Sequence, residues 1–310
     1  MSSPIYPFES FQTNRMSCLA IGNFDGVHYA HQKLLREMVT SAQQHSWESY
    51  VLTFEPHPRK VIQTTPQFHL LQSYEKKYET LIGTGIDGVI VANFTKEFSS
   101  TCPVHFLEIL CTKIPLKSVY IGFNFRFGKG AIGTPLAMRS FLEPKNILCH
   151  IFEPIELDGL KISSAFLRNE IASGHIDSYW RYTGRPYCVE EKVITGSDRG
   201  NKIGYATANL QSVNPLLKHG VYIAQTTLAD SSVHRSLVHV GPNPTFDDPK
   251  IKTEVHIPGF AGNLYGQFLK VEFMKYLREI QIFENVKALQ GRISQDINSM
   301  GDYFKNRGIL

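Results

Sequence analysis

The spacing of apolar runs changes about halfway along the chain, and this change constrains the fold more than any other feature. From Ser17 to about Phe152, short apolar or β-branched runs alternate with segments long enough to hold a helix; the runs are CLAIG, YVLTF, GVIVANF, SVYIG and NILCHIF. This alternation predicts an α/β domain with a parallel sheet built from βαβ crossovers. Helices are expected at Gln32–Gln44 and near Pro103–Thr112, and ligands are expected at the carboxyl ends of the strands.

In the second half, apolar runs follow one another without helices between them. They are CVEEKVI, GVYIAQTTL, SLVHVG, TEVHI and QFLKVEFMKYL, and the turns between them contain Gly, Pro, Asn and Asp. This pattern predicts a small antiparallel β-barrel. Gly184 and Pro186 lie where the pattern changes and favour a break in regular structure, so we place a first domain at 1–183 and a second at 184–310. The spacing of apolar residues in Glu284–Met300 predicts a terminal helix packed on the barrel.

Composition and charge exclude several classes of protein. Lys and Arg total 32 against 28 for Asp and Glu, and the chain has no dense basic run, so no nucleic-acid partner is expected. No apolar run reaches the length of a membrane span, and the N-terminus lacks a secretory apolar core. The five cysteines lie far apart without a C-x-x-C pair, which indicates reduced thiols in a cytoplasmic protein.

A Gly-rich loop, GNFDGVHYAHQKLL, follows the first predicted strand and leads into the first predicted helix. Backbone N–H groups at such a helix start attract phosphate oxygens, which makes Gly22, Asn23, Phe24 and Asp25 candidates for binding phosphate. Asp25 either orders the loop or approaches a metal. His28 and His31 are three residues apart, so two imidazoles can contact one phosphate chain and stabilise the charge that develops on it.

Three further stretches of the first half carry polar residues beside apolar ones: TFEPHPRKV, IGFNFRFGKGAIG and ISSAFLR. In the last of these, Ser163 and Ser164 offer hydroxyls at a predicted helix start, and Arg168 follows about one turn later, where its guanidinium group can make two hydrogen bonds to phosphate oxygens. In GFNFRFGKG, phenylalanines alternate with Asn124 and Arg126. This alternation predicts a strand with one packed side and one side that reaches a ligand.

The second half contains GSDRGNKIGYATANL, in which Gly196, Gly200 and Gly204 permit close approach of the backbone to a phosphate. The segment is not a Walker A loop, because G-K-[ST] is missing. Taken alone, it is typical of a mobile hairpin tip.

Together these motifs resemble those of prokaryotic bifunctional riboflavin kinase/FAD synthetases. The first loop is similar to the H-x-G-H signature of nucleotidyltransferases, and the second to the G-x-x-R-G-x-x-x-G-x-P-T-A-N element of riboflavin kinases. VGPNPTF, TEVHIPGFAGNLYG and the final helix also match, so the resemblance runs from about Ser17 to Ile297. It implies a Rossmann-like nucleotidyltransferase domain and a riboflavin kinase barrel that together make FMN and then FAD.

The resemblance also implies site residues, cofactors and partners. Riboflavin, FMN and ATP are the expected small-molecule ligands, and Mg²⁺ is the expected metal. In the first half, the resemblance implies that His28, His31 and Arg168 stabilise charge and that His57 and Asn124 contact the flavin. In the second half, it implies that Thr207 and Asn209 bind magnesium and that Glu254 is the catalytic base. The implied phosphate contacts there are Arg199, Gly196, Gly200 and Gly204. The sequence leaves the oligomeric state open.

Three alanines depart from the family's signatures. Ala30 replaces the glycine of H-x-G-H, Ala165 replaces a threonine after the two serines, and Ala206 replaces the proline of P-T-A-N. The last change frees a backbone dihedral angle next to Thr207. Two alternatives therefore remain open: a monofunctional FAD synthetase with an impaired kinase barrel, and a non-catalytic module that senses flavin or nucleotide.

Overall fold

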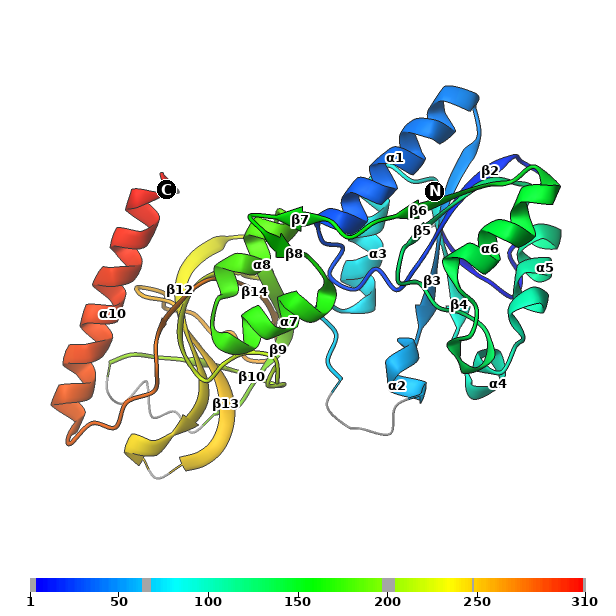
Figure 1. Ribbon diagram of the computed structural model, residues 1–310. Helices are drawn as coiled ribbons and strands as arrows, with labels where there is room; N and C mark the ends of the chain where they lie inside the picture. The colour runs from blue at the N-terminus through cyan, green and yellow to red at the C-terminus, as the bar shows by residue number, and fades with distance from the viewer. Residues whose placement is uncertain (1–3, 63–67, 197–203, 247, 309–310) are drawn as a thin grey trace. The chain divides into compact units, whose positions relative to one another are not determined.

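A computed structural model describes residues 4–62, 68–196, 204–246 and 248–308 (Figure 1). The chain divides into two compact units, Met1–Phe166 and Leu167–Leu310. The division lies before the domain boundary expected from the sequence. It falls within helix α7 (Ser164–Ser173), and α8 (Ile176–Thr183) lies between the two positions. The boundary at 183/184 stays a prediction.

The first unit is built on a parallel six-stranded sheet, as the alternation of apolar runs predicts. Its strands are β1 (Ile5–Pro7), β2 (Ser17–Ile21), β3 (Glu48–Glu55), β4 (Gly88–Asn93), β5 (Leu116–Gly122) and β6 (Leu148–Phe152). They are arranged in the order β1-β4-β3-β2-β5-β6. A second, two-stranded sheet pairs β7 (Glu156–Leu157) with β8 (Leu160–Lys161).

Helices cover both faces of this sheet (Figure 1). They are α1 (Tyr29–His45), α2 (Pro58–Ile62), α3 (Tyr74–Ile82), α4 (Lys96–Ser99), α5 (Pro103–Lys113) and α6 (Pro135–Leu142), with 3₁₀ turns η1 (Lys129–Ala131) and η2 (Glu143–Lys145). Because successive strand residues point to opposite faces, β2 contributes to two cores. Leu19 and Ile21 pack with residues of α5 and α6, whereas Cys18 and Ala20 pack with residues of α1 and α3.

The predicted strand at Phe123–Phe127 is wrong. Strand β5 ends at Gly122, and the Phe125 amide donates to the Gly122 carbonyl at 3.0 Å, which closes a turn. The rings of Phe125 and Phe127 stack with centroids 5.7 Å apart and both belong to the core beside α5 and α6. Alternating aromatic residues therefore serve here to anchor an irregular loop, and Asn124 lies exposed on the turn.

The second unit is a closed antiparallel barrel, which confirms the predicted fold class. Its strands are β9 (Tyr187–Ile194), β10 (Ala208–Leu210), β11 (Gly220–Thr227), β12 (Val233–Asn243), β13 (Asp248–His256) and β14 (Phe268–Arg278), with the 3₁₀ turn η3 (Pro244–Phe246) between β12 and β13. The strand order is β10-β13-β12-β11-β14-β9, and pairing of β9 with β10 closes the ring.

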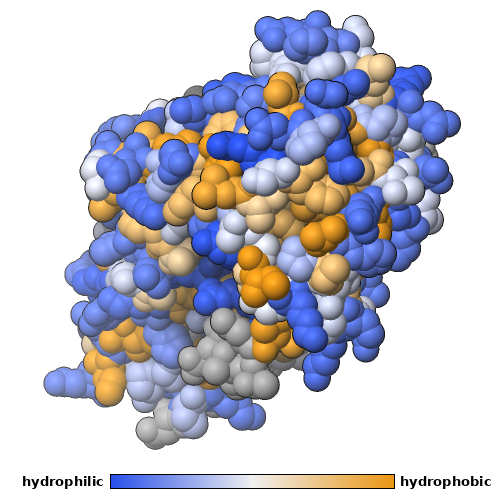
Figure 2. Space-filling model, turned by 45° about the vertical axis from the view of Figure 1, so that its right-hand side comes forward, coloured by the Kyte–Doolittle hydropathy of each residue, from blue (hydrophilic) through white to orange (hydrophobic). Residues whose placement is uncertain are grey.

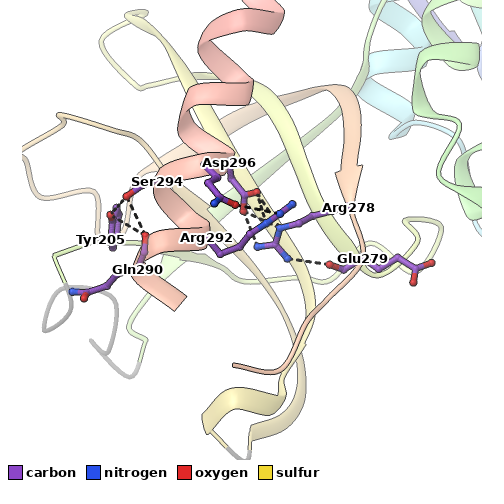
Figure 3. Close-up of polar contacts among 8 residues, drawn as sticks. Tyr205, Arg278, Glu279, Gln290, Arg292, Ser294 and Asp296 are labelled. Atoms are coloured by element: carbon purple, nitrogen blue, oxygen red, sulfur yellow. Dashed lines mark hydrogen bonds and ion pairs between the residues drawn. The ribbon is translucent and has the colours of Figure 1, made fainter. Parts of the chain in front are cut away.

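The terminal helix α10 (Val286–Asn306) packs on the outside of the barrel, as expected (Figure 1). Met300 and Phe304 enter an apolar cluster with Val221, Ile223 and Leu237, together with Met274. Asp296 of α10 is 2% exposed; it accepts a hydrogen bond from the Arg278 Nη2 of β14 at 2.7 Å and forms an ion pair with the Arg292 Nε at 3.2 Å (Figure 3). A charged pair this well buried fixes the position of the helix, because removal of either residue leaves the charge of the other buried without compensation.

No helix among the described residues is both long and apolar enough to cross a bilayer. On the face drawn in Figure 2, hydrophilic side chains surround the apolar patches.

Candidate active sites

The order of strands in the first unit reverses at β2. From β2 the chain moves through β3 and β4 on one side, and then returns to β5 and β6 on the other side. Ligands of open parallel sheets bind at such a reversal, outside the carboxyl ends of the strands. The loop between β2 and α1, residues 22–28, begins at this point.

This loop has an unusual backbone that other segments hold in place. Phe24, Gly26 and Val27 all have positive φ angles, of 50°, 81° and 35°. A Cβ atom on Gly26 would lie 2.7 Å from the Leu71 Cδ1, so the position requires glycine for space as well as for conformation. The Asp25 carboxylate, 3% exposed, accepts from the Leu71 amide at 3.0 Å. Asp25 thus orders the loop, which is one of the two roles expected for it.

The two predicted histidines lie together at the start of α1. His28 precedes the helix as its N-cap residue and is 4% exposed, and the rings of His28 and His31 stack with centroids 3.7 Å apart. The Phe24 ring meets the His31 ring edge-on at 5.1 Å. The first turn of α1 has no acidic residue, so the positive end of the helix dipole favours an anion there.

The start of α7 is fastened to the same loop. Ser163 caps α7 by accepting from the Phe166 amide at 3.2 Å, and the Ser164 hydroxyl donates to the Asp25 carbonyl at 2.8 Å. The structure therefore brings Ser164 to the loop, although the two segments are far apart in sequence. Arg168 follows one turn later on α7, and Ala165 is exposed.

His57 lies just beyond the carboxyl end of β3 and is 6% exposed. Its amide donates to the Tyr74 hydroxyl at 2.8 Å, and its Nδ1 accepts from the Arg59 amide at 3.2 Å. The Phe68 ring lies 4.4 Å from the imidazole. His57 is thus held on a rigid turn at the edge of the sheet where ligands bind, whereas Asn124 lies on the exposed turn after β5.

Helix α3 contributes polar residues that the motifs did not reveal. Tyr74, Lys77 and Tyr78 share one face of the helix, and Lys77 is 4% exposed. Burial lowers the pKa of Lys77 to about 8, although the charges of Asp25 and Glu55 act in the opposite direction. The spacing of the tyrosines and the lysine in YEKKYETLI could have identified these residues, since it places three polar groups on the side of the helix that faces the sheet.

In the second unit, strand pairing aligns the predicted base with a predicted magnesium ligand. Asn209 of β10 and His239 of β12 both pair directly with Glu254 of β13. Residues that are directly opposite in neighbouring strands present their side chains on the same face. The Glu254 Oε2 also accepts from the Asn243 Nδ2 at 3.3 Å. Burial lowers the pKa of His239, against the influence of Glu254, so the neighbour of the base favours its neutral form.

Gly196 lies against the Asn209 side chain, so a larger residue at this position would displace that side chain. A Cβ atom at this position would lie 2.7 Å from the Asn209 Cγ and would also meet its amide nitrogen. Both residues line a pocket of about 440 Å³, together with Asp248 and Lys252. The Lys252 Nζ donates to Asp248 at 2.6 Å. Arg199 and Gly200 lie outside the described residues.

The segment before β10 is braced by two elements, and sequence reasoning did not identify either brace. The His256 Nδ1 donates to the Ala206 carbonyl at 2.8 Å, and the Tyr205 ring lies 5.5 Å from the His256 ring. On the other side, the Tyr205 hydroxyl is 2.8 Å from the Ser294 Oγ of α10 and donates to the Gln290 carbonyl at 3.3 Å (Figure 3). The backbone next to Thr207 is therefore fixed although Ala206 is not proline.

Comparison with known proteins gives consistent matches over both units. The FAD synthetase family model matches residues 10–166, and the riboflavin kinase family model matches residues 183–304. Curated proteins named bifunctional riboflavin kinase/FMN adenylyltransferase are similar over most of their length. The protein from Pseudomonas fluorescens is 32% identical (90% of this chain, 91% of the relative), and that from Bacillus subtilis is 30% identical (94% and 93%).

A solved structure from Streptococcus pneumoniae also has a similar fold. It is titled a macrolide-efflux protein, and it superposes with a TM-score of 0.86 at 25% identity over 96% of this chain and 98% of that chain.

Proposed function

This chain belongs to the family of bifunctional riboflavin kinase/FMN adenylyltransferases, and from that premise we propose how its residues divide the two reactions. ATP phosphorylates riboflavin to FMN, and a second ATP adenylylates FMN to FAD with release of pyrophosphate. One observation carries the division of labour: the His28–His31 stack belongs to the first unit, whereas the Asn209–Glu254 pair belongs to the second.

Adenylyl transfer takes place at the carboxyl edge of the parallel sheet. The FMN phosphate attacks the α-phosphorus of ATP, so no nucleophile of the protein is required, and the protein's task is to position the reactants and stabilise charge. We assign the phosphates of ATP to the loop 22–28 and to the start of α7, with His28, His31 and Arg168 facing the developing charge. His57 and Asn124 contact the flavin. The ordered loop, the stacked imidazoles and the Ser164 hydrogen bond support this assignment.

Phosphorylation of riboflavin takes place on the barrel. Glu254 accepts the proton of the ribityl hydroxyl while the γ-phosphate is held in line by Gly196, Arg199, Gly200 and Gly204. Thr207 and Asn209 provide a hydroxyl and an amide oxygen, which are donors that Mg²⁺ accepts, and the lack of space beside Gly196 holds Asn209 in one place. When bound with ATP, magnesium neutralises charge on the transferred phosphate.

We further propose a cytoplasmic location and domains that meet at 183/184. The free state of all the cysteines supports the first, and the start of the riboflavin kinase match at residue 183 supports the second. The ligands that we propose are the small molecules riboflavin, FMN and ATP. The brace on the Ala206 carbonyl argues against an impaired kinase.

Turnover by the purified chain tests the proposed function against its alternatives. Riboflavin with MgATP is expected to yield FMN first and FAD second, which chromatography of the flavins resolves. A monofunctional FAD synthetase would adenylylate added FMN but leave riboflavin unchanged, and a sensing module would form neither product.

Gly196→Ala is expected to impair only the kinase. The added methyl group displaces the Asn209 amide, and a displacement of about 1 Å in a catalytic group costs on the order of 100-fold in rate. Gly291→Ala on α10, where a Cβ atom has nothing within 4 Å, is the control and should retain the activity. Steady-state rates of both reactions measure the effect, and an unchanged kinase rate in Gly196→Ala would remove Asn209 from the assignment.

A further inference from the structure

Helix α3 makes hydrogen bonds to three residues at the carboxyl end of β3. The Tyr74 hydroxyl accepts from the His57 amide at 2.8 Å, the Lys77 Nζ donates to the Thr53 Oγ1 at 3.1 Å, and the Tyr78 hydroxyl donates to Glu55. His57, Thr53 and Glu55 all belong to the carboxyl end of β3 or to the turn after it. The helix therefore holds the edge of the sheet that borders the predicted nucleotide crevice.

Lys77 extends this connection to the phosphate loop itself. The Thr53 Oγ1 accepts the hydrogen bond from the Lys77 Nζ and in turn donates to the Asn23 carbonyl at 3.2 Å, so a single chain of hydrogen bonds runs from α3 to the loop. The ammonium group also lies 5.0 Å and 5.2 Å from the ring centroids of Tyr74 and Tyr78. A lysine with 4% exposure loses most of its hydration, and such a group persists only where partners compensate the loss.

The charge of Lys77 also matters at this position. Two carboxylates, Asp25 and Glu55, act on it electrostatically, and Asp25 is within the loop that is assigned to ATP. Carboxylates beside a triphosphate would repel it, and the repulsion is strong because buried charges are poorly screened by solvent. The Lys77 ammonium group offsets that negative charge.

We propose that Lys77 is a positioning residue for adenylyl transfer. Through Thr53 it fixes the Asn23 carbonyl and the shape of the phosphate loop, and its charge offsets Asp25 and Glu55 so that the loop accepts ATP. This inference rests on the assignment of adenylyl transfer to the first unit.

Steady-state kinetics of the full chain test the proposal, with ATP varied at saturating FMN. Lys77→Met is expected to lower kcat/KM for ATP by up to about 100-fold, mainly through KM, and to leave riboflavin phosphorylation unchanged. Lys76→Met is the matched control, since Lys76 is on the exposed side of the same helix and pairs with Glu79 at 2.8 Å. It should change the rate by no more than about twofold.

The pH profile separates a role for the charge from a purely structural role. Because the pKa of Lys77 is about 8, the ammonium group loses its proton above that pH, the carboxylates are no longer offset, and kcat/KM for ATP should fall. The other groups that face Lys77 are Asp25, Glu55, Tyr74 and Tyr78, and the two tyrosines have raised pKa values, so they remain protonated there. Lys77→Arg keeps its charge, so it should retain activity and lose the alkaline fall.

Several results would overturn the proposal. One is an unchanged KM for ATP in Lys77→Met; another is an alkaline fall that persists in Lys77→Arg. If Lys77→Met does not fold, as judged by its melting temperature, Thr53→Val decides: it removes only the intermediate hydroxyl and should raise KM for ATP, and an unchanged KM refutes the link. Absence of FAD formation in the unmodified chain would overturn the proposed function, and with it this inference.

Discussion

His28→Ala is expected to reduce FAD formation from FMN by about 100- to 1000-fold, the usual effect of removing a group that stabilises charge in a transition state. His28 is buried at the N-terminus of α1 and stacks on His31, so its truncation removes one of the two imidazoles assigned to the phosphates. Riboflavin phosphorylation should be unchanged, because Glu254 and Asn209 belong to the other unit.

His45→Ala provides the matched control, since His45 is an exposed histidine at the opposite end of the same helix. Both activities should persist in that variant. The two rates are measured separately, with FMN and with riboflavin as the starting flavin. Loss of both activities in a folded His28→Ala protein would contradict separate sites, and full FAD formation would remove His28 from the reaction.

Glu254→Gln is expected to produce the opposite result. Loss of a general base typically costs about 100- to 10,000-fold, and glutamine can keep the hydrogen bond from Asn243 while losing the ability to take a proton. Riboflavin phosphorylation should therefore fall by that factor while FMN adenylylation continues.

The same replacement at Glu190, an exposed glutamate of β9, is the control and should affect neither reaction. Comparison of melting temperatures shows whether the barrel remains folded. A kinase rate in Glu254→Gln equal to that of the unmodified chain would show that Glu254 is not the base.

The fold could be predicted where periodicity and burial agree. Strand β2 is buried throughout and is followed by an amphipathic helix, so its place in a covered parallel sheet is evident from the sequence. The strand predicted at Phe123–Phe127 was wrong because alternation shows only which side chains are buried. A loop anchored by stacked rings gives the same pattern as a strand. Helix α1 starts at Tyr29, before the predicted Gln32, because its buried apolar stripe, from which the helix was predicted, begins only at Leu34.

The candidate sites were predictable only in part. Motifs led to His28, His31, Asn209 and Glu254, and the structure places the members of each pair side by side. Lys77 could not be found in this way, because its importance arises from burial and from contacts with residues distant in sequence. Asn243 and Tyr205 likewise gain their contacts only once β13 and α10 are in place.

The hydrogen bond from Ser164 to the Asp25 carbonyl has a consequence for assembly. Its two ends are 139 residues apart, and α7 follows every strand of the sheet in synthesis order. Contacts between such distant positions form late, since the entropy cost of ordering the long intervening segment comes before the favourable energy of the contact. A nascent chain can thus complete its six-stranded sheet while the loop after β2 is still open, so competence to hold a nucleotide is acquired at the end of that unit's folding.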